Sequence, residues 1–138
     1  MKEFFTRAGA NAGTRIELKL PDGKPSPHWL HVLGADGDVF RQAAVVASRE
    51  VVRAISALPK TPTDAELAKI RQEARLRNLA AVIESWSFPQ PCDEDNKLEL
   101  LREAPQIADA VDRLITDRSL FTNGSSANSD AAPEAQPS

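Results

Sequence analysis

Prolines punctuate the middle and the end of the chain, and they limit where its helices can run. The five that matter are Pro59, Pro62, Pro89, Pro91 and Pro105. Proline lacks the backbone N–H that a helix interior needs, and its ring clashes with the preceding turn. The spacing of these residues therefore predicts about four helices between residues 36 and 121.

The segment between Pro62 and Pro89 has the clearest helical signal. Thr63 and Glu66 have the spacing of a capping box, in which each side chain bonds the backbone N–H of the other residue. Apolar residues then recur at intervals of three and four, which predicts an amphipathic helix that runs to about Trp86. Phe88 lies beyond this helix and is expected to pack back on it.

Three further helices are predicted on either side of this segment. Apolar residues from Phe40 to Leu58 share one helical face, and Asp36 or Asp38 is the expected N-cap. A short helix is expected to open at Cys92 or Asp93, because acidic residues favour a first turn. Pro105 then ends that helix or begins a fourth.

The residues before the first helix have the pattern of a β-hairpin. Apolar and charged side chains alternate from Thr14 to Leu20, which is typical of a half-buried strand. A Pro-Asp-Gly turn follows, and residues 28–33 resume as a second strand. A lone hairpin is marginal in water, so this one is expected to pack on the helices.

These elements predict a mainly α domain at residues 14–121, with an N-terminal β-hairpin packed on a small bundle of about four helices. Residues 1–13 are expected to be flexible. Residues 122–138 are expected to form a disordered tail, because Ala is the only apolar residue type after residue 122.

Charge and composition exclude several classes of function. Formal net charge is −3, divided between +3 in residues 1–60 (nine basic, six acidic) and −6 in the remainder (eight basic, fourteen acidic). Nucleic-acid binding is not expected without a basic cluster, and no apolar run approaches the roughly 20 residues of a membrane span. The uneven charge does permit self-association.

Residues with catalytic or ligand chemistry are few, and no enzymatic, cofactor or metal site is predicted. His28 and His31 would face opposite sides of a strand and so could not share a metal. Cys92 is the only cysteine, and the neighbouring acids disfavour its thiolate. The acidic run at residues 93–95 lacks the EF-hand pattern and is interpreted as a helix cap.

Aromatic side chains are the remaining candidates for function. They are either ordinary core residues or parts of an exposed apolar patch that binds another protein, since aromatics are enriched at interface anchors. The candidate partner-binding residues are Trp29, Phe40, Trp86, Phe88 and Phe121.

The order of features from Arg15 to Phe121 resembles the tail assembly chaperones of long-tailed bacteriophages and prophages. Residues 20–25 (LPDGKP) and 28–34 (HWLHVLG) are similar to that family's opening hairpin, and residues 36–43 are similar to the segment that follows, with Gly37 at a place where Ser is common. The later matches are Leu79–Ile83, Ser85–Phe88, Asn96, Leu100–Leu101, Ala104–Ile107, Val111–Asp112 and Phe121.

This resemblance implies a non-enzymatic protein of the host cytoplasm. Such a factor binds the tape measure protein, recruits tail tube subunits during assembly and is absent from the mature virion. The alternative is a small structural component of the virion, such as a head–tail connector or a tail-completion protein.

Overall fold

The computed structural model describes residues 1–122, which contain five α-helices and three β-strands. The predicted tail at 122–138 lies outside the described residues except for Thr122. The elements are η1 (Lys2–Phe4), α1 (Arg7–Ala12), β1 (Thr14–Lys19), β2 (Pro25–Val32), α2 (Asp38–Ser56), α3 (Asp64–Val82), β3 (Ile83–Trp86), α4 (Glu94–Glu103), α5 (Pro105–Ile115) and η2 (Arg118–Phe121). The predicted mainly α character is confirmed.

The predicted hairpin is present, but it belongs to a larger antiparallel sheet with the strand order β1-β2-β3. The prediction that a helix runs to about Trp86 is wrong, because α3 ends at Val82 and the chain continues as β3. The backbone N–H of Leu33 donates to the Val82 carbonyl at 2.9 Å. From Ile83 onward the backbone therefore pairs with β2 instead of continuing the helix.

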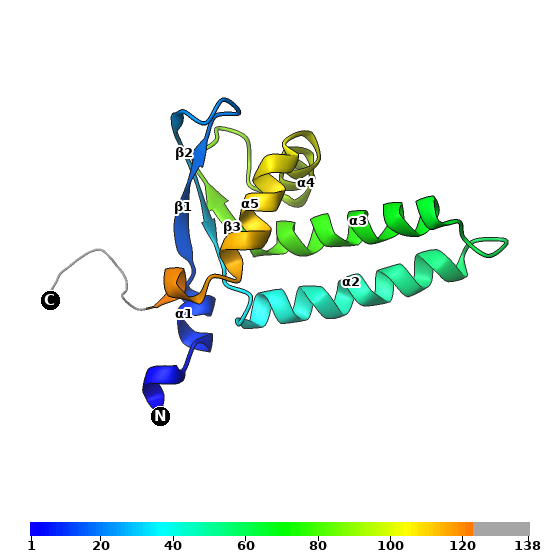
Figure 1. Cartoon of the computed structure of the whole chain (residues 1–138), viewed down its shortest axis with the longest axis horizontal. Coiled ribbons are helices and arrows are strands. Elements are labelled where there is room, and N and C mark those ends of the chain that lie inside the picture. Colours follow the sequence, from blue (N-terminus) through cyan, green and yellow to red (C-terminus); the bar gives the residue numbers. More distant parts are fainter. Residues whose placement is uncertain (123–138) are drawn as a thin grey trace, which may run out of the picture.

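The core lies between one face of the sheet and the helices α3, α4 and α5 (Figure 1). Alternation along β1 is confirmed, since Ile16 and Leu18 are buried while Arg15 and Glu17 are exposed. The largest fully buried side chains come from β2, α3, β3, α4 and α5: Leu30, Val32, Leu79, Val82, Ile83, Leu101, Val111 and Ile115. Arg75 of α3 also forms ion pairs with Asp109 and Asp112 of α5.

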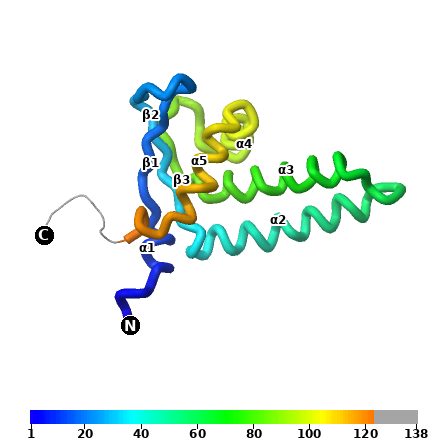
Figure 2. Tube along the Cα trace, in the orientation of Figure 1, coloured from blue at the N-terminus to red at the C-terminus, as the bar shows by residue number. Residues whose placement is uncertain are grey.

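Helices α2 and α3 form an antiparallel pair that projects from the rest of the fold (Figures 1 and 2). The predicted apolar face of α2, from Phe40 to Leu58, is half-buried, and none of the α2 residues is fully buried. The number of helices roughly fits the prediction of about four, but the projecting α2–α3 pair means that they do not all pack as one small bundle. Only the C-terminal half of α3 enters the core, through Leu76, Leu79, Ala80 and Val82.

Residues 1–13 were expected to be flexible, and most of them are helical in the structure. They form η1 and α1, and Ala10 is only 2% exposed. The Gly34 N–H donates to the Ala10 carbonyl at 2.9 Å, which joins α1 to the chain after β2. Helix α1 also lies beside η2 near the end of the described chain (Figure 2).

Most of the helix caps and helix starts predicted from the sequence are present in the structure. Thr63 and Glu66 form the predicted capping box at α3, and Asp93 caps α4 by accepting from the Asn96 N–H at 2.9 Å. Pro105 begins α5. The prediction for α2 is wrong, because Gly37 occupies the N-cap position and neither Asp36 nor Asp38 caps the helix with its side chain.

Candidate functional site

Trp86 lies at the end of strand β3, on the face of the sheet that carries the helices. It pairs with the buried Leu30 of β2, and side chains directly opposite each other in a sheet share a face. The indole Nε1 donates to the Gln90 carbonyl at 2.8 Å. This bond ties the ring to the loop between β3 and α4 and leaves part of its surface exposed.

Phe88 extends the aromatic surface beside Trp86. Its ring meets Trp86 edge-on at 5.2 Å between centroids and stacks on His28 at 4.6 Å. Ser87 anchors the same loop to β2, because its Oγ accepts from the Trp29 N–H at 2.9 Å. Both aromatic rings are therefore held by the sheet rather than carried on a free loop.

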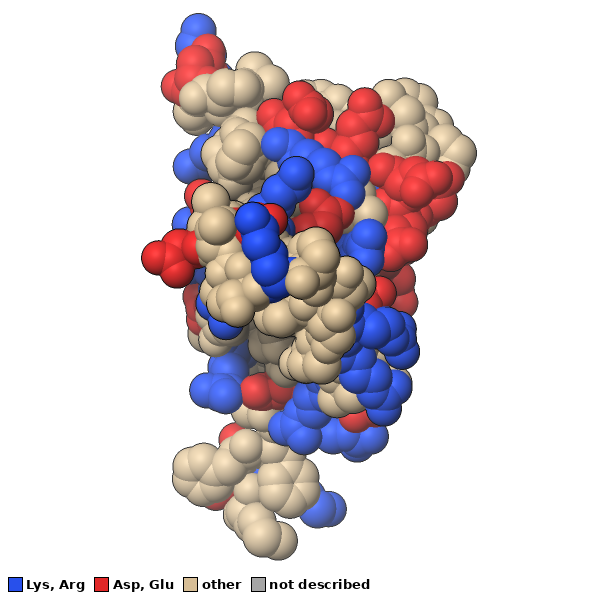
Figure 3. Space-filling view, turned by 90° about the vertical axis from the view of Figure 1, so that its right-hand side faces the viewer, with Lys and Arg blue, Asp and Glu red and all other residues tan. Residues whose placement is uncertain are grey.

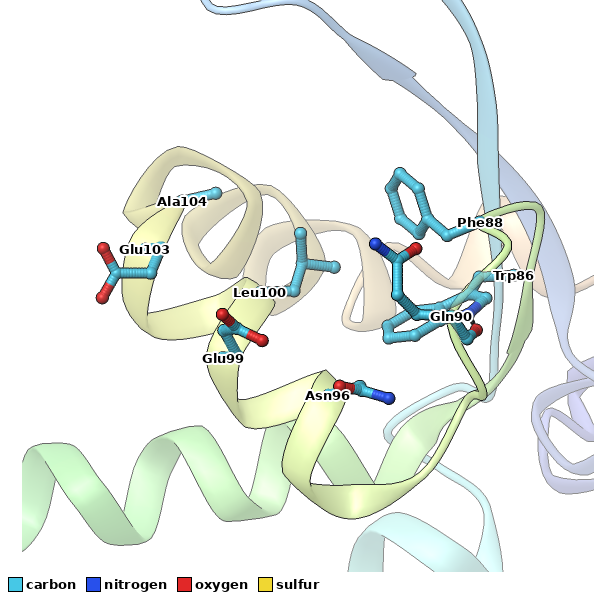
Figure 4. A pocket seen from close by; sticks show the side chains of 8 residues that line it. All are labelled: Trp86, Phe88, Gln90, Asn96, Glu99, Leu100, Glu103 and Ala104. Carbon is cyan, nitrogen blue, oxygen red and sulfur yellow. Dashed lines mark hydrogen bonds between the residues drawn. The ribbon is translucent and has the colours of Figure 1, made fainter.

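Leu100 of α4 faces these two rings across a groove of about 300 Å³, which we call the Trp86 groove (Figure 4). Trp86, Phe88 and Leu100 form its apolar floor, and Ala104 closes one end. All three floor residues are half-buried and pack against the core. The groove thus presents exposed apolar area on a rigid support, which is the usual character of an interface anchor.

Polar and acidic residues line the edge of the Trp86 groove. They are Gln90, Asn96, Glu99 and Glu103. The Asn96 side-chain amide donates to the Pro91 carbonyl at 2.9 Å, so it also holds the loop. Within residues 1–122, Glu99 and Glu103 form no ion pair. The groove therefore combines an apolar floor with a negative rim.

The structure brings together only two of the five predicted partner-binding residues. Trp29 lies on the other face of the sheet, where the Arg15 guanidinium covers its ring at 3.8 Å from the centroid. Phe40 is half-buried against the core at the start of α2. Phe121 is 7% exposed and belongs to the core, away from the other two aromatics.

Sequence reasoning missed the α4 side of this groove. Leu100 and its neighbour Leu101 are both apolar, and only Leu101 is fully buried. The signal was available in the helical spacing, because Leu98 and Leu101 define the inner face and Leu100 falls outside it.

The remaining reactive residues are far apart or engaged in structural contacts. His28 Nδ1 lies 3.1 Å from Ser87 Oγ, whereas His31 Nε2 lies 3.0 Å from the Ala12 carbonyl. Burial raises the pKa of the Cys92 thiol. Among residues 1–122, no three His, Cys, Asp or Glu side chains are grouped so that they could hold a metal ion.

Comparison with known proteins adds no further assignment. No protein-family model, curated protein or solved structure matches the chain. None of the helices in the described residues combines the length and the apolar character needed to cross a membrane.

Proposed function

We propose that this protein is a tail assembly chaperone of a long-tailed bacteriophage or prophage. It would bind the tape measure protein, recruit tail tube subunits and stay in the host cytoplasm rather than in the mature virion. The proposal rests on the ordered resemblance between Arg15 and Phe121. The observation that supports it best in the structure is the Trp86 groove, an apolar surface that no side chain among residues 1–122 fills.

Binding is proposed to follow the helix-in-groove mode. An apolar helix lays side chains at three- and four-residue spacing into a hydrophobic groove, and buried aromatics supply most of the affinity. Trp86, Phe88 and Leu100 supply such a floor, and their rigid support limits the entropy lost on binding. Covering the apolar face of a tape measure helix in this way would keep that protein soluble before the tail tube forms.

Co-expression tests the proposal directly. The tape measure protein encoded with this chain should be more soluble when both are produced together, and the two should co-purify. Leu100→Ser should abolish this gain, whereas Val52→Ser, an exposed position on α2, should leave it intact. An equally insoluble tape measure protein in the presence and absence of the wild-type chain would overturn the proposal.

Absence from the virion needs a separate measurement. Mass spectrometry of purified particles should detect the tail tube and tape measure proteins but not this chain. A stoichiometric amount of this chain in the particle would favour the alternative, a small structural component of the virion.

A further inference from the structure

Helix α2 leaves a second apolar surface open, lined by residues different from those of the Trp86 groove. Val39 and Val46 are 39% and 41% exposed, although they lie seven residues apart on one side of α2. They line a groove of about 480 Å³ that also takes in Ala81 of α3 and Glu94 of α4. We call it the α2–α4 groove. Val39 and Val46 thus combine exposed apolar area with a concave surface.

Opposite charges lie beside this groove on α2 and at the start of α4, and we call these two sides its edges. Arg49 and Arg53 follow Val46 by three and seven residues, so they lie on the adjoining strip of α2. Glu94 lines the groove on the other edge, and Asp95 follows it in the first turn of α4. Figure 3 shows acidic side chains gathered above basic ones along one side of the molecule. Within residues 1–122, Arg49, Arg53 and Glu94 form no ion pair.

On the floor of the groove, in contrast, opposite charges already pair within the chain. Glu50 of α2 and Arg77 of α3 both line it, and they form an ion pair at 3.3 Å. The charges without partners are therefore confined to the edges, where an approaching molecule would meet them. An acidic edge and a basic edge on one face make that face complementary to itself after a rotation of 180°.

We infer that the α2–α4 groove is the contact surface of a closed dimer, in which two copies of the chain meet across a two-fold axis. Arg49 and Arg53 of each copy meet Glu94 and Asp95 of the other, and the contact occurs twice. The Val39 and Val46 side chains of the two copies cover each other between the charged edges. The two-fold axis closes the assembly at two copies, whereas a head-to-tail contact would leave it open.

This inference does not depend on the proposed function, because it uses neither the Trp86 groove nor any partner protein. The charges at the edges of the α2–α4 groove also predict that dimerisation depends on salt concentration. Exposed charges are screened over about 10 Å at 0.1 M ionic strength, so added salt should weaken the dimer.

Sedimentation equilibrium on the full chain tests the dimer. The wild type should pass from one to two protomers with rising concentration and should never exceed two. Arg49→Glu with Arg53→Glu should weaken dimerisation at least about tenfold through like-charge contacts. Glu94→Lys with Asp95→Lys should do the same. An equimolar mixture of the two variants should regain a dimer, because both charged contacts then pair correctly.

Two matched controls separate this surface from general effects of charge and hydrophobicity. Arg71→Glu with Arg113→Glu reverses two exposed arginines elsewhere and should leave the dimer intact. Val39→Ser with Val46→Ser should dissociate it, whereas Val45→Ser with Val52→Ser, on another side of α2, should not. Circular dichroism confirms that each variant is folded.

Three results would overturn the inference. A wild-type chain that stays monomeric would show that the groove is not a dimer contact and would point to a different protein as its partner. A mass that grows beyond two protomers would indicate a head-to-tail contact. A dimer that survives both charge reversals would place the interface elsewhere.

Discussion

The side chain of Asn11 caps a helix that begins 27 residues later in the chain. Its Oδ1 accepts from the backbone N–H of Asp38 at 2.8 Å, and its Nδ2 donates to the Asp38 carboxylate at 3.2 Å. Arg7 adds two hydrogen bonds to the same carboxylate. Helix α1 thus supplies the N-terminal cap that the local sequence of α2 lacks, which joins the start of the chain to the projecting helix pair.

Removing this cap should destabilise the fold. Asn11→Ala leaves a free N–H at the first turn of α2, and loss of an N-cap acceptor typically costs about 1 kcal/mol. Thr63→Ala, which removes the local cap of α3, is the matched comparison and should cost a similar amount. Urea denaturation followed by circular dichroism measures both. An unchanged midpoint for Asn11→Ala beside a lowered one for Thr63→Ala would show that Asn11 does not act as a cap.

The ion pair between Asp36 and Arg118 should make stability depend on pH. Hydrogen bonds from Arg118, and then from Thr6, lower the pKa of Asp36 from 3.8 to about 2. The Arg118 Nε lies 2.6 Å from the carboxylate. Asp36 therefore contributes stability that is complete above about pH 4 and is lost as the pH falls to about 2, because the unfolded chain binds the proton first.

Denaturation midpoints between pH 5 and pH 2 test this linkage. Asp36→Asn and Arg118→Gln should each flatten the decline, and the double variant should add little more. Part of the slope should remain, because Arg7 lowers the pKa of Asp38 in the same direction. If the stability of Asp36→Asn declined with falling pH as steeply as that of the wild type, Asp36 would not contribute to the decline.

Gly13 and Gly23 should respond very differently to alanine. Both have positive φ, +80° and +89°. A Cβ at Gly13 would lie 2.6 Å from the Val32 carbonyl oxygen, whereas one at Gly23 would meet nothing within 4 Å. Gly23→Ala should cost about 1 kcal/mol from the backbone alone. Gly13→Ala should cost about 3 kcal/mol or more, because strain and a clash add. Equal thermal shifts for the two variants would contradict this.

Trp86 and Trp29 form a second matched pair. Under the proposed function, Trp86→Ala should abolish binding of the tape measure protein or unfold the domain, because the ring is half-buried and lines the Trp86 groove. Trp29→Ala, on the other face of the sheet, should retain binding. Trp86→Phe keeps much of the core packing and should fold while binding more weakly. Full binding by a folded Trp86→Ala variant would remove this residue from the site.

Val52 on α2 and Val82 on α3 differ in exposure, so shortening each side chain should change the stability differently. Val52 is 64% exposed and Val82 is 0% exposed. Val52→Ala should stabilise slightly, by up to about 0.5 kcal/mol, because alanine is the better helix former. Val82→Ala should cost about 2 kcal/mol, because it removes buried methyl groups and leaves a cavity. Chemical denaturation checks both values, and a loss at Val52 would indicate that its side chain is covered.

Short-range patterns predicted most of the secondary structure. Thr63 with Glu66, Asp93 and Pro105 marked three helix starts, because a cap or a proline acts within one turn of the chain. Alternation marked β1 for the same reason. Residues 83–86 were misassigned because Ile83 and Trp86 suit a helix face and a strand equally well. They form a strand only because β2 lies beside them in the folded chain and pairs with them.

The candidate site was half predictable. Trp86 and Phe88 stand out in the sequence as aromatics at a break before Pro89, where they could be either core residues or parts of an exposed patch. Leu100 could not be assigned to the same site, because its nearness to Trp86 depends on how α4 packs against the sheet.

The sequence by itself determined the elements whose causes are local: the capped helices, the turn before β2 and the alternating strand β1. The tertiary structure decided three further features, namely the strand at residues 83–86, the cap that Asn11 gives to α2 and the side of the sheet on which each tryptophan lies. The physical reason is the range of the interactions. Caps and periodicity act over a few residues, whereas strand pairing and packing join residues that only the folded chain brings together.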